Sequence, residues 1–219
     1  MPKGLQHCNS GNAVEISTDS AVFAWIRPVL AGLRHSNLSR PATSVPMPAT
    51  PDDLFAYLDR LNIPHATVTH PPLFTVADSQ SLRGTIPGGH TKNLFLKDKA
   101  DVLFLVVADE DAAIDMKSLH HRLGSKRLSF GSAALLTEVL GIPPGSVTPF
   151  AAINDAVGRV TVILDQAMMA HETLNFHPLT NTMTTSIARD DLPRFLCATG
   201  HPPRILAVSA TPAGAVTAD

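Results

Sequence analysis

Two apolar segments on either side of a short polar turn constrain the fold of this chain more than any other feature. Residues 93–96 and 102–108 are rich in Leu, Val and Phe, and the polar residues 98–101 separate them. Apolar runs of this length around a polar turn predict a β-hairpin. A Pro-Gly-Gly turn comes just before it and leads into four hydrogen-bonding side chains, those of His90, Thr91, Lys92 and Asn93.

The polar segment 90–93 has two interpretations. Loops held by a rigid scaffold often carry binding and catalytic groups, and this segment brings a cation to the start of a strand. The same pattern is typical of a solvated turn before a hairpin, and the segment alone favours that simpler interpretation. The other segments of the chain have to decide between the two.

The remaining pattern predicts an α+β fold. Thr50, Pro51 and two acidic residues form the signature of a helix N-terminus. Strands outnumber helices and many neighbours can pair antiparallel, so we expect a mixed, largely antiparallel central sheet surrounded by helices. Further helices are expected at residues 78–83, 116–123, 132–140 and 190–199, and further strands at residues 65–70, 127–130, 159–164, 173–176, 182–188 and 205–208.

The first fifty residues differ in composition from the rest. They are rich in Ser, Thr, Asn, Pro and Ala, and prolines punctuate residues 41–51. This composition predicts a disordered extension over residues 1–49, with one weak helical stretch around residues 20–33. Translation that starts at Met47 is the alternative. The folded domain is expected over residues 50–210, followed by a flexible tail at 211–219.

Charge and hydropathy exclude several classes of protein. The net charge is −2, from 17 Lys+Arg against 19 Asp+Glu, so a nucleic-acid contact would need a local basic patch. No segment reaches the ~18 apolar residues of a membrane span. Residues 21–26 are apolar, but Arg27 and Pro28 end that run and no basic leader precedes it. We therefore expect a cytoplasmic protein without membrane contact.

Residues 116–137 could form such a patch, because they hold four Lys or Arg, two His and no acid. The pattern fits phosphate binding and a solvated helix face about equally well when Lys92, Lys97 and Lys99 are added. His120 and His121 are adjacent on the expected helix and should diverge by about 100°, so no metal site is expected there.

Two later loops carry further candidates. Residues 140–150 contain two glycines and three prolines, which predict a rigid loop where Gly145 lets a ligand approach the backbone; a plain connector is the commoner case. In residues 175–185, His177 lies beside a proline among many hydroxyl groups. A lone histidine is more often structural, although this setting favours a functional role modestly.

Four segments occur in the order seen in one protein family. Residues 90–98 (HTKNLFLKD), 119–130 (LHHRLGSKRLSF), 145–149 (GSVTP) and 175–181 (NFHPLTN) resemble the free-standing prolyl-tRNA editing proteins, relatives of the YbaK family and of the insertion domain of bacterial prolyl-tRNA synthetase. The similarity extends over residues 52–208. It is strongest to the branch that deacylates alanine mischarged onto proline tRNA.

The resemblance implies roles for particular residues. Lys92 matches the essential lysine of the family, Gly145 the glycine whose backbone holds the aminoacyl group, and His177 the histidine of a late Phe-His-Pro loop. Substrate or tRNA contacts are implied for the rest of the first motif and for two basic positions associated with the tRNA acceptor end, namely His90, Thr91, Asn93, Lys97 and Arg127.

The implied reaction fits the residues found. An aminoacyl ester is already labile, so placing water and donating to the developing oxyanion suffices, and one oxyanion donor contributes roughly 3–4 kcal/mol. Lys92 would hold the terminal nucleotide or polarise the carbonyl; both remain open. No cofactor or metal is expected. The implied partner is the acceptor end of aminoacylated proline tRNA, and prolyl-tRNA synthetase or an elongation factor is a further candidate.

Selectivity for alanine has a physical basis. A synthetase pocket shaped for proline excludes the smaller alanine poorly, because each missing methylene is worth only ~1–3 kcal/mol. A second site too small for proline then hydrolyses the error. Two alternatives stay open: a deacylase for Cys-tRNA(Pro) or another small aminoacyl-tRNA, and a non-catalytic tRNA-binding module.

Overall fold

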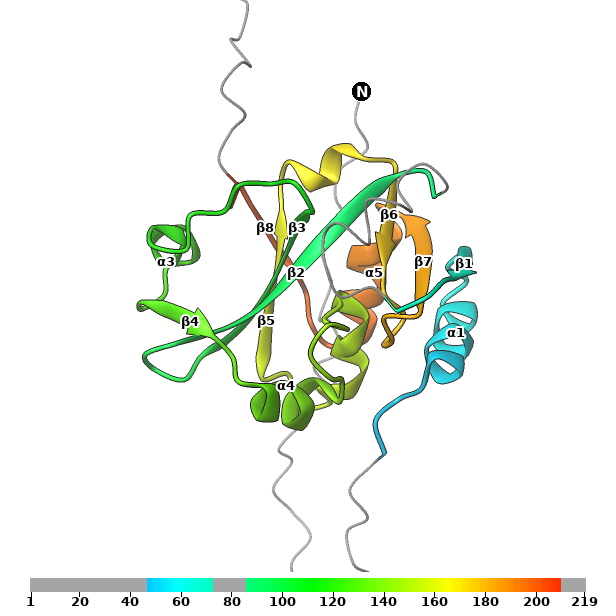
Figure 1. The fold of residues 1–219 in the computed structure, drawn as a ribbon, viewed down its shortest axis with the longest axis horizontal. Helices are drawn as coiled ribbons and strands as arrows, with labels where there is room; N and C mark the ends of the chain where they lie inside the picture. Colours follow the sequence, from blue (N-terminus) through cyan, green and yellow to red (C-terminus); the bar gives the residue numbers. More distant parts are fainter. Residues whose placement is uncertain (1–46, 73–85, 210–219) are drawn as a thin grey trace, which may run out of the picture. The chain divides into compact units, whose positions relative to one another are not determined.

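The computed structural model describes residues 47–72 and 86–209 (Figure 1). The predictions for the N-terminal extension up to residue 46, the helix at 78–83 and the tail at 211–219 lie outside the described residues. No helix in the described part is long and apolar enough to cross a membrane.

Helix α1 (Pro51–Arg60) begins at the predicted signature. The Thr50 hydroxyl accepts the backbone N–H of Asp53 at 3.2 Å, and the Asp53 carboxylate accepts the backbone N–H of Thr50 at 2.9 Å. This reciprocal capping box satisfies two helix-end donors. Leu54 and Leu58 then lie one turn apart and are fully buried in the main core.

One mixed sheet organises the described domain (Figure 1). Its strands run in the order β1-β7-β6-β2-β3-β5-β8, and β4 pairs with β2. Four neighbouring pairs are antiparallel and three are parallel, which confirms the α+β prediction. The strands are β1 (His65–Thr69), β2 (Gly89–Asp98), β3 (Leu103–Asp109), β4 (Leu128–Phe130), β5 (Val160–Asp165), β6 (Thr173–Phe176), β7 (Met183–Ala188) and β8 (Arg204–Leu206).

Strand β2 differs most from its prediction. It starts at Gly89 instead of residue 93, because Thr91 and Lys92 pair with Asp109 and Ala108 of β3. The polar segment is therefore part of the sheet and not an entry loop. The distant partner strands supply backbone hydrogen bonds that local polarity did not predict.

Within the described residues, the predicted helices are present with small changes. Helix α3 (Leu119–Leu123) is shorter than predicted, whereas α4 (Ala133–Leu140) and α5 (Asp191–Ala198) lie close to their predicted ranges. Two 3-10 helices, η1 (Pro149–Asn154) and η2 (Met168–Ala170), were not predicted. For η1 a signal existed, since the Thr148 hydroxyl accepts the N–H of Phe150 and a proline follows Thr148.

The two faces of the sheet carry different cores. Phe95 belongs to the larger cluster, which also includes side chains of α1, α4, η1 and α5. Its neighbour Leu96 belongs to a smaller cluster with Leu119 and Leu123 of α3. Since side chains alternate along a strand, Lys92 and Leu94 share the α3 face with Leu96.

Candidate active site

Two glycines, Gly88 and Gly89, allow the start of β2 to lie very close to the start of β6 and to His171 before it. Gly88 has φ +105°, and a Cβ there would lie 2.8 Å from the carbonyl oxygen of Thr173. A Cβ on Gly89 would lie 2.5 Å from the His171 ring. Any side chain at these positions would push the two segments apart, so the glycines set the spacing between β2 and β6.

Hydrogen bonds with Asn175 of β6 hold the start of β2 in position. Its amide Nδ2 donates to the carbonyl oxygen of Pro87 at 3.1 Å, and its Oδ1 accepts the Ser186 hydroxyl at 2.6 Å. The Thr91 hydroxyl donates to the Asn175 carbonyl oxygen at 2.9 Å. His90 is held separately, by a 3.1 Å contact from its Nε2 to the Ile86 carbonyl oxygen.

Lys92 is half-buried and has a fixed position. Its ammonium donates to the carbonyl oxygen of Ala112, in the segment that follows β3. An ammonium group has three donors, so two remain for a ligand among the residues that the structure describes. Asn93 is on the opposite face of β2, and its buried Oδ1 has no hydrogen-bond partner among the described residues.

His177 directly follows β6, which is the parallel neighbour of β2. In the parallel register His90 pairs with Asn175, and Lys92 and His177 each come two residues later. The ring contacts the Met183 carbonyl oxygen through Nδ1 at 3.1 Å. Because a carbonyl only accepts, Nδ1 carries the proton and the neutral ring presents Nε2 as an acceptor.

The surroundings of His177 favour its neutral form. Burial lowers the pKa of His177, and the nearby His70 lowers it further, while the bond to Met183 and the charge of Glu110 oppose the shift. The His70 ring lies 6.4 Å from the His177 ring and is fixed by a 2.9 Å contact to the Thr184 hydroxyl. The neutral imidazole is therefore the main form near pH 7.

Gly145 lies in the loop between α4 and η1. The N–H of Ser146 donates to the Pro143 carbonyl oxygen at 3.2 Å, and Gly145 has φ +88° after Pro144, which is the pattern of a type II turn. A Cβ on Gly145 would meet nothing closer than the Asn181 amide, at 3.8 Å. Asn181 belongs to the same loop as His177, so this turn faces the β6–β7 connection.

An open hollow of about 350 Å³ lies beside the start of β2. His171 Nε2 is 3.0 Å from Asp109 Oδ1 at this hollow. Burial raises the pKa of Asp109, although the charge of His171 and its hydrogen bond act in the opposite direction. Lys92, Gly145 and His177 do not line the hollow, whose walls are formed by Gly88, Gly89, His90, Asp109, Glu110, Asp111 and His171.

The predicted site residues fall into two groups. Lys97 is five positions beyond Lys92, which places it roughly 16 Å away on the other face of β2. Its ammonium pairs with Asp101 at 2.8 Å. Arg127 is exposed just before β4, which pairs with the same end of β2. These two cations therefore lie apart from the group formed by Lys92, His177 and the segment 90–93.

Several residues near Lys92 and His177, and the arrangement of two histidine rings, were not predicted from the sequence. His70 and Glu110 influence His177, yet each lies in a segment without a recognisable local motif. Asn175 contacts Thr91 and lies in the fourth motif, where it was not singled out. The rings of His120 and His121 do not diverge as predicted, because their centroids are 3.9 Å apart. No group of three or more His, Cys, Asp or Glu with metal-binding geometry occurs within residues 47–72 and 86–209.

Comparisons with known proteins agree on one family. Residues 70–195 match the model of the aminoacyl-tRNA editing domain. Prolyl-tRNA synthetase associated domain-containing protein 1 of Danio rerio is 39% identical, over 70% of this chain and 85% of that protein. Prolyl-tRNA editing protein ProX of Acetoanaerobium sticklandii is 34% identical, over 68% of this chain and 91% of that protein.

A solved structure shows the same fold. The hypothetical protein APE2540 superposes with a TM-score of 0.56 at 18% identity, and the match covers 70% of this chain and 97% of that chain. At this level of identity the likeness concerns the fold alone.

Proposed function

Because this chain belongs to the aminoacyl-tRNA editing domain family, we propose that it hydrolyses the ester of mischarged aminoacyl-tRNA(Pro) as a free-standing protein. The observation that supports the proposal is the position of Lys92 in β2 and of His177 just after β6, each two residues beyond the paired His90 and Asn175 of these parallel strands. The substrate is the aminoacylated acceptor end of proline tRNA, and the site of action is the cytoplasm.

The reaction needs no covalent intermediate with the protein. Water adds to the ester carbonyl carbon, the bond from that carbon to the ribose oxygen breaks, and the ribose oxygen takes up a proton lost by the water. The protein holds the ester and stabilises the negative charge that develops on the carbonyl oxygen. Donors fixed in advance serve this purpose best, because they need no reorganisation during the reaction.

Two kinds of donor are available for this charge. Lys92 keeps two N–H donors after its bond to Ala112, and it serves either the carbonyl oxygen or the phosphate of the terminal nucleotide. Gly145 exposes backbone at a turn with positive φ, so its amide can approach the aminoacyl group without a side chain in the way. The neutral His177 accepts a hydrogen bond from the attacking water or a ribose hydroxyl.

We propose alanine as the preferred aminoacyl group, with cysteine as the competing choice. A site that excludes proline by size admits both smaller side chains, and the size difference between them is worth only ~1–3 kcal/mol. Selection between these two substrates therefore rests on the detailed fit of the pocket.

A deacylation panel tests this function. Purified full-length protein is incubated with Ala-, Cys-, Ser- and Pro-tRNA(Pro), and release of each labelled amino acid is followed over time. We expect rapid loss of alanine and no loss of proline above the spontaneous rate. Binding of tRNA without release of any amino acid would instead identify a non-catalytic module, and faster release of cysteine would reassign the substrate.

A further inference from the structure

Phe130 of β4 is the most exposed aromatic residue in the described part of the chain. The residue is 64% exposed, and the other large apolar residues at the surface are aliphatic. Apolar surface is more stable when it is removed from water, so an exposed aromatic ring favours contact with a binding partner. Nothing in the proposed hydrolysis requires this ring, so its exposure needs another explanation.

The ring lies on the same face of the sheet as Lys92. Phe130 is the register partner of Leu96 in the antiparallel β2–β4 pair, and paired residues point to one face. Lys92 is four positions before Leu96 on β2, so it shares that face at a distance of about 13 Å along the strand.

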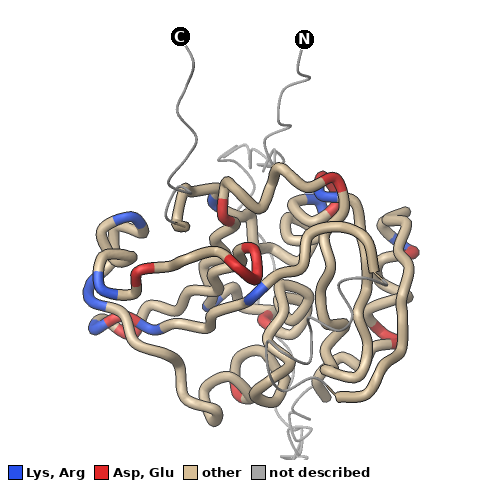
Figure 2. Tube along the Cα trace, turned by 45° about the horizontal axis from the view of Figure 1, so that its top comes forward, with Lys and Arg blue, Asp and Glu red and all other residues tan. Residues whose placement is uncertain are grey.

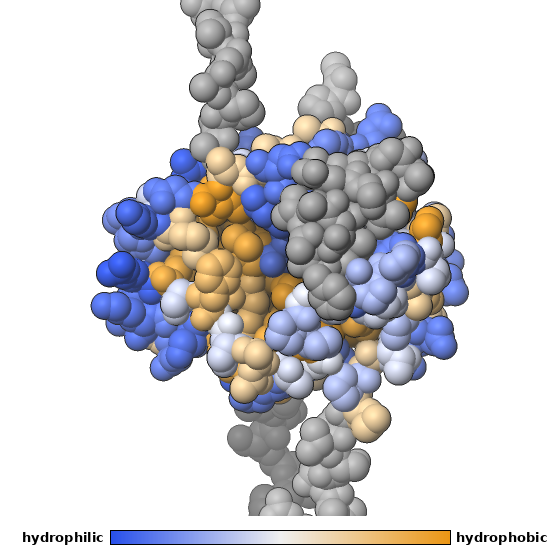
Figure 3. Space-filling model, viewed as in Figure 1, coloured by the Kyte–Doolittle hydropathy of each residue, from blue (hydrophilic) through white to orange (hydrophobic). Residues whose placement is uncertain are grey.

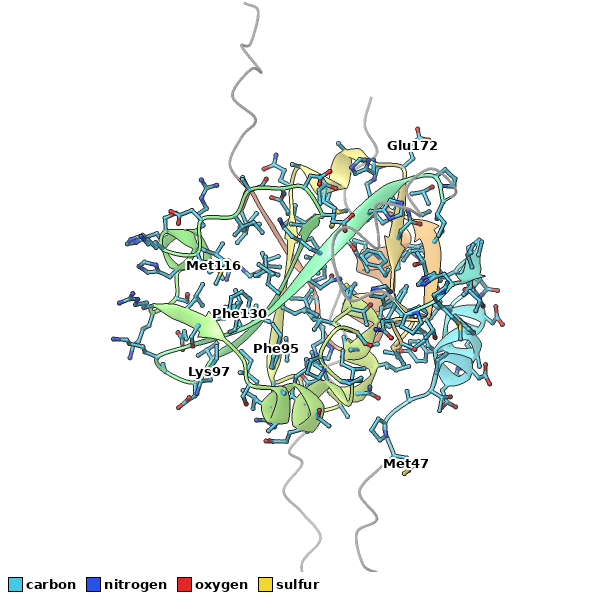
Figure 4. All side chains as sticks on the ribbon, in the orientation of Figure 1. Met47, Phe95, Lys97, Met116, Phe130 and Glu172 are labelled. Atoms are coloured by element: carbon cyan, nitrogen blue, oxygen red, sulfur yellow. The ribbon has the colours of Figure 1, made fainter. Side chains whose placement is uncertain are left out.

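Several half-buried apolar side chains share this face of the sheet. They pack on the smaller core cluster, and with Phe130 they form what we call the apolar strip, namely Leu94, Ile114, Met116, Leu128 and Phe130. Figure 3 shows apolar surface in this region, next to a hydrophilic edge. Phe130 and Met116 are labelled in Figure 4 on β4 and in the segment before α3.

Cations gather at the β4 end of the strip. Lys126 and Arg127 directly precede β4, and both are exposed. Lys97, on the other face of β2 and paired with Asp101, and Lys99, just after β2, lie at the neighbouring end of that strand. Lys and Arg therefore concentrate at this edge (Figure 2). The Asp98 carboxylate is buried and accepts the backbone N–H groups of Ala100, Val102 and Lys126.

We propose that the apolar strip binds the unpaired 3′ end of the tRNA, with one base stacked on Phe130 and its phosphate held by Lys126 and Arg127. Surfaces that bind single-stranded nucleic acid combine cations for the backbone with aromatic rings for the bases. The strand would run along the strip and deliver the terminal, aminoacylated nucleotide to Lys92. The identity of the RNA rests on the proposed function; the stacking on Phe130 does not.

The charge pattern decides between this occupant and a protein. A second copy of the chain or another protein could also cover an exposed phenylalanine. The edge beside the strip is basic in a chain whose net charge is −2, so its cations are concentrated locally. The local cluster of cations favours binding of a polyanion such as RNA. It disfavours a second copy of the chain, because two identical basic edges would repel each other.

The test separates stacking from simple apolar contact. Phe130→Leu keeps an apolar side chain but removes the ring, and Phe130→Trp keeps a ring. Val157→Ala alters another exposed apolar residue, which is not part of the strip. The probe is an unacylated RNA hairpin with the 3′ end of tRNA(Pro), in which 2-aminopurine replaces each unpaired base in turn. Fluorescence then reports both affinity and stacking.

We expect Phe130→Leu to weaken hairpin binding roughly 5- to 150-fold, the range found for loss of base–aromatic stacking. One upstream 2-aminopurine position should lose its stacking signal in Phe130→Leu and keep it in Phe130→Trp and Val157→Ala. In deacylation, Phe130→Leu should raise KM and change kcat little. Equal affinity of wild type and Phe130→Leu, or a Phe130-dependent dimer in sedimentation, would overturn the proposal.

The two proposals fail in different ways. If no tRNA is deacylated but Phe130→Leu still weakens hairpin binding, the hydrolytic function is wrong and the stacking surface stands. If deacylation is normal and its KM is the same in Phe130→Leu, the function stands and the stacking surface is wrong.

Discussion

Lys92 owes its defined position to one hydrogen bond. Its ammonium donates to the Ala112 carbonyl oxygen, so a flexible side chain is anchored across the α3 face of β2. The sequence motif identified the residue, but the anchor lies twenty positions further along the chain. The motif around Lys92 does not reveal this partner, because Ala112 comes near Lys92 only when β3 pairs with β2.

Replacing Lys92 with alanine should abolish deacylation while the fold is retained. The half-buried ammonium stabilises negative charge on the substrate, and removal of a donor of this kind lowers kcat by about 10²–10³-fold. Single-turnover rates on Ala-tRNA(Pro) give the loss, and circular dichroism checks the fold. Arg60→Ala is the control, since Arg60 is an exposed cation in the last turn of α1. Wild-type turnover in Lys92→Ala would contradict the proposed role.

His177 should make the protein less stable in mild acid. Burial holds the pKa of His177 below its usual value of about 6.5, so the unfolded chain takes up this proton at a higher pH than the folded chain. Its contribution to stability is complete above pH ~6.5 and is lost as the pH falls toward the folded-state pKa.

Urea unfolding at pH 7.5 and pH 5.5 measures this effect. The free energy of unfolding of the wild type should fall between the two pH values by more than that of His177→Gln. The comparison isolates His177 from the other histidines, which titrate in both proteins. A pH dependence that is the same in the two proteins would show that His177 is not responsible.

At the scale of elements, local signals predicted most boundaries. The Thr50 capping box starts α1, and glycines in the left-handed conformation end α3 and α4 at Gly124 and Gly141. Helix-capping signals involve residues only a few positions apart, so the helix ends can be predicted from the sequence. The first four residues of β2 were missed because their strand conformation depends on pairing with β3 and β6.

Gly89→Ala tests the close approach of β2 to the segment before β6. The added Cβ would lie 2.5 Å from the His171 ring, and overpacking of this kind costs about 1–3 kcal/mol. We expect lower stability and slower deacylation, measured by thermal unfolding and by release of alanine. The double variant Gly89→Ala/His171→Ala should recover part of the stability, because the obstructing ring is gone. Strict additivity of the two substitutions would argue against the clash.

At the scale of the whole domain, a buried polar pair connects the C-terminal part to the sheet. His201 follows α5, and its Nε2 lies 3.1 Å from Asp155 Oδ2, with each side chain only 1% exposed. The same carboxylate oxygen accepts the N–H of Val160 at the start of β5, at 2.8 Å. The pair therefore fixes α5 against η1 and β5.

His201→Ala should lower the free energy of unfolding by roughly 3–5 kcal/mol, because it leaves Asp155 buried without its partner. Chemical denaturation measures the loss, and the exposed His121→Ala serves as the control. The kcat for deacylation should stay the same below the unfolding temperature, since Val160, which bonds to Asp155, is aligned through Leu103 with Lys97 and not with Lys92. A loss below 1 kcal/mol would mean that the pair contributes little.

The sequence by itself determined the fold class, most element boundaries and the motifs that carry Lys92, Gly145 and His177. These depend on local capping, periodicity and residue order, all of which are properties of neighbouring positions. Only the tertiary structure decided that β2, which carries Lys92, is the parallel neighbour of β6, which His177 follows. It also decided that Lys97 lies on the opposite face of β2 and that Phe130 shares the face of Lys92. Strand order and register set these relations, and both depend on pairing between segments far apart in the chain.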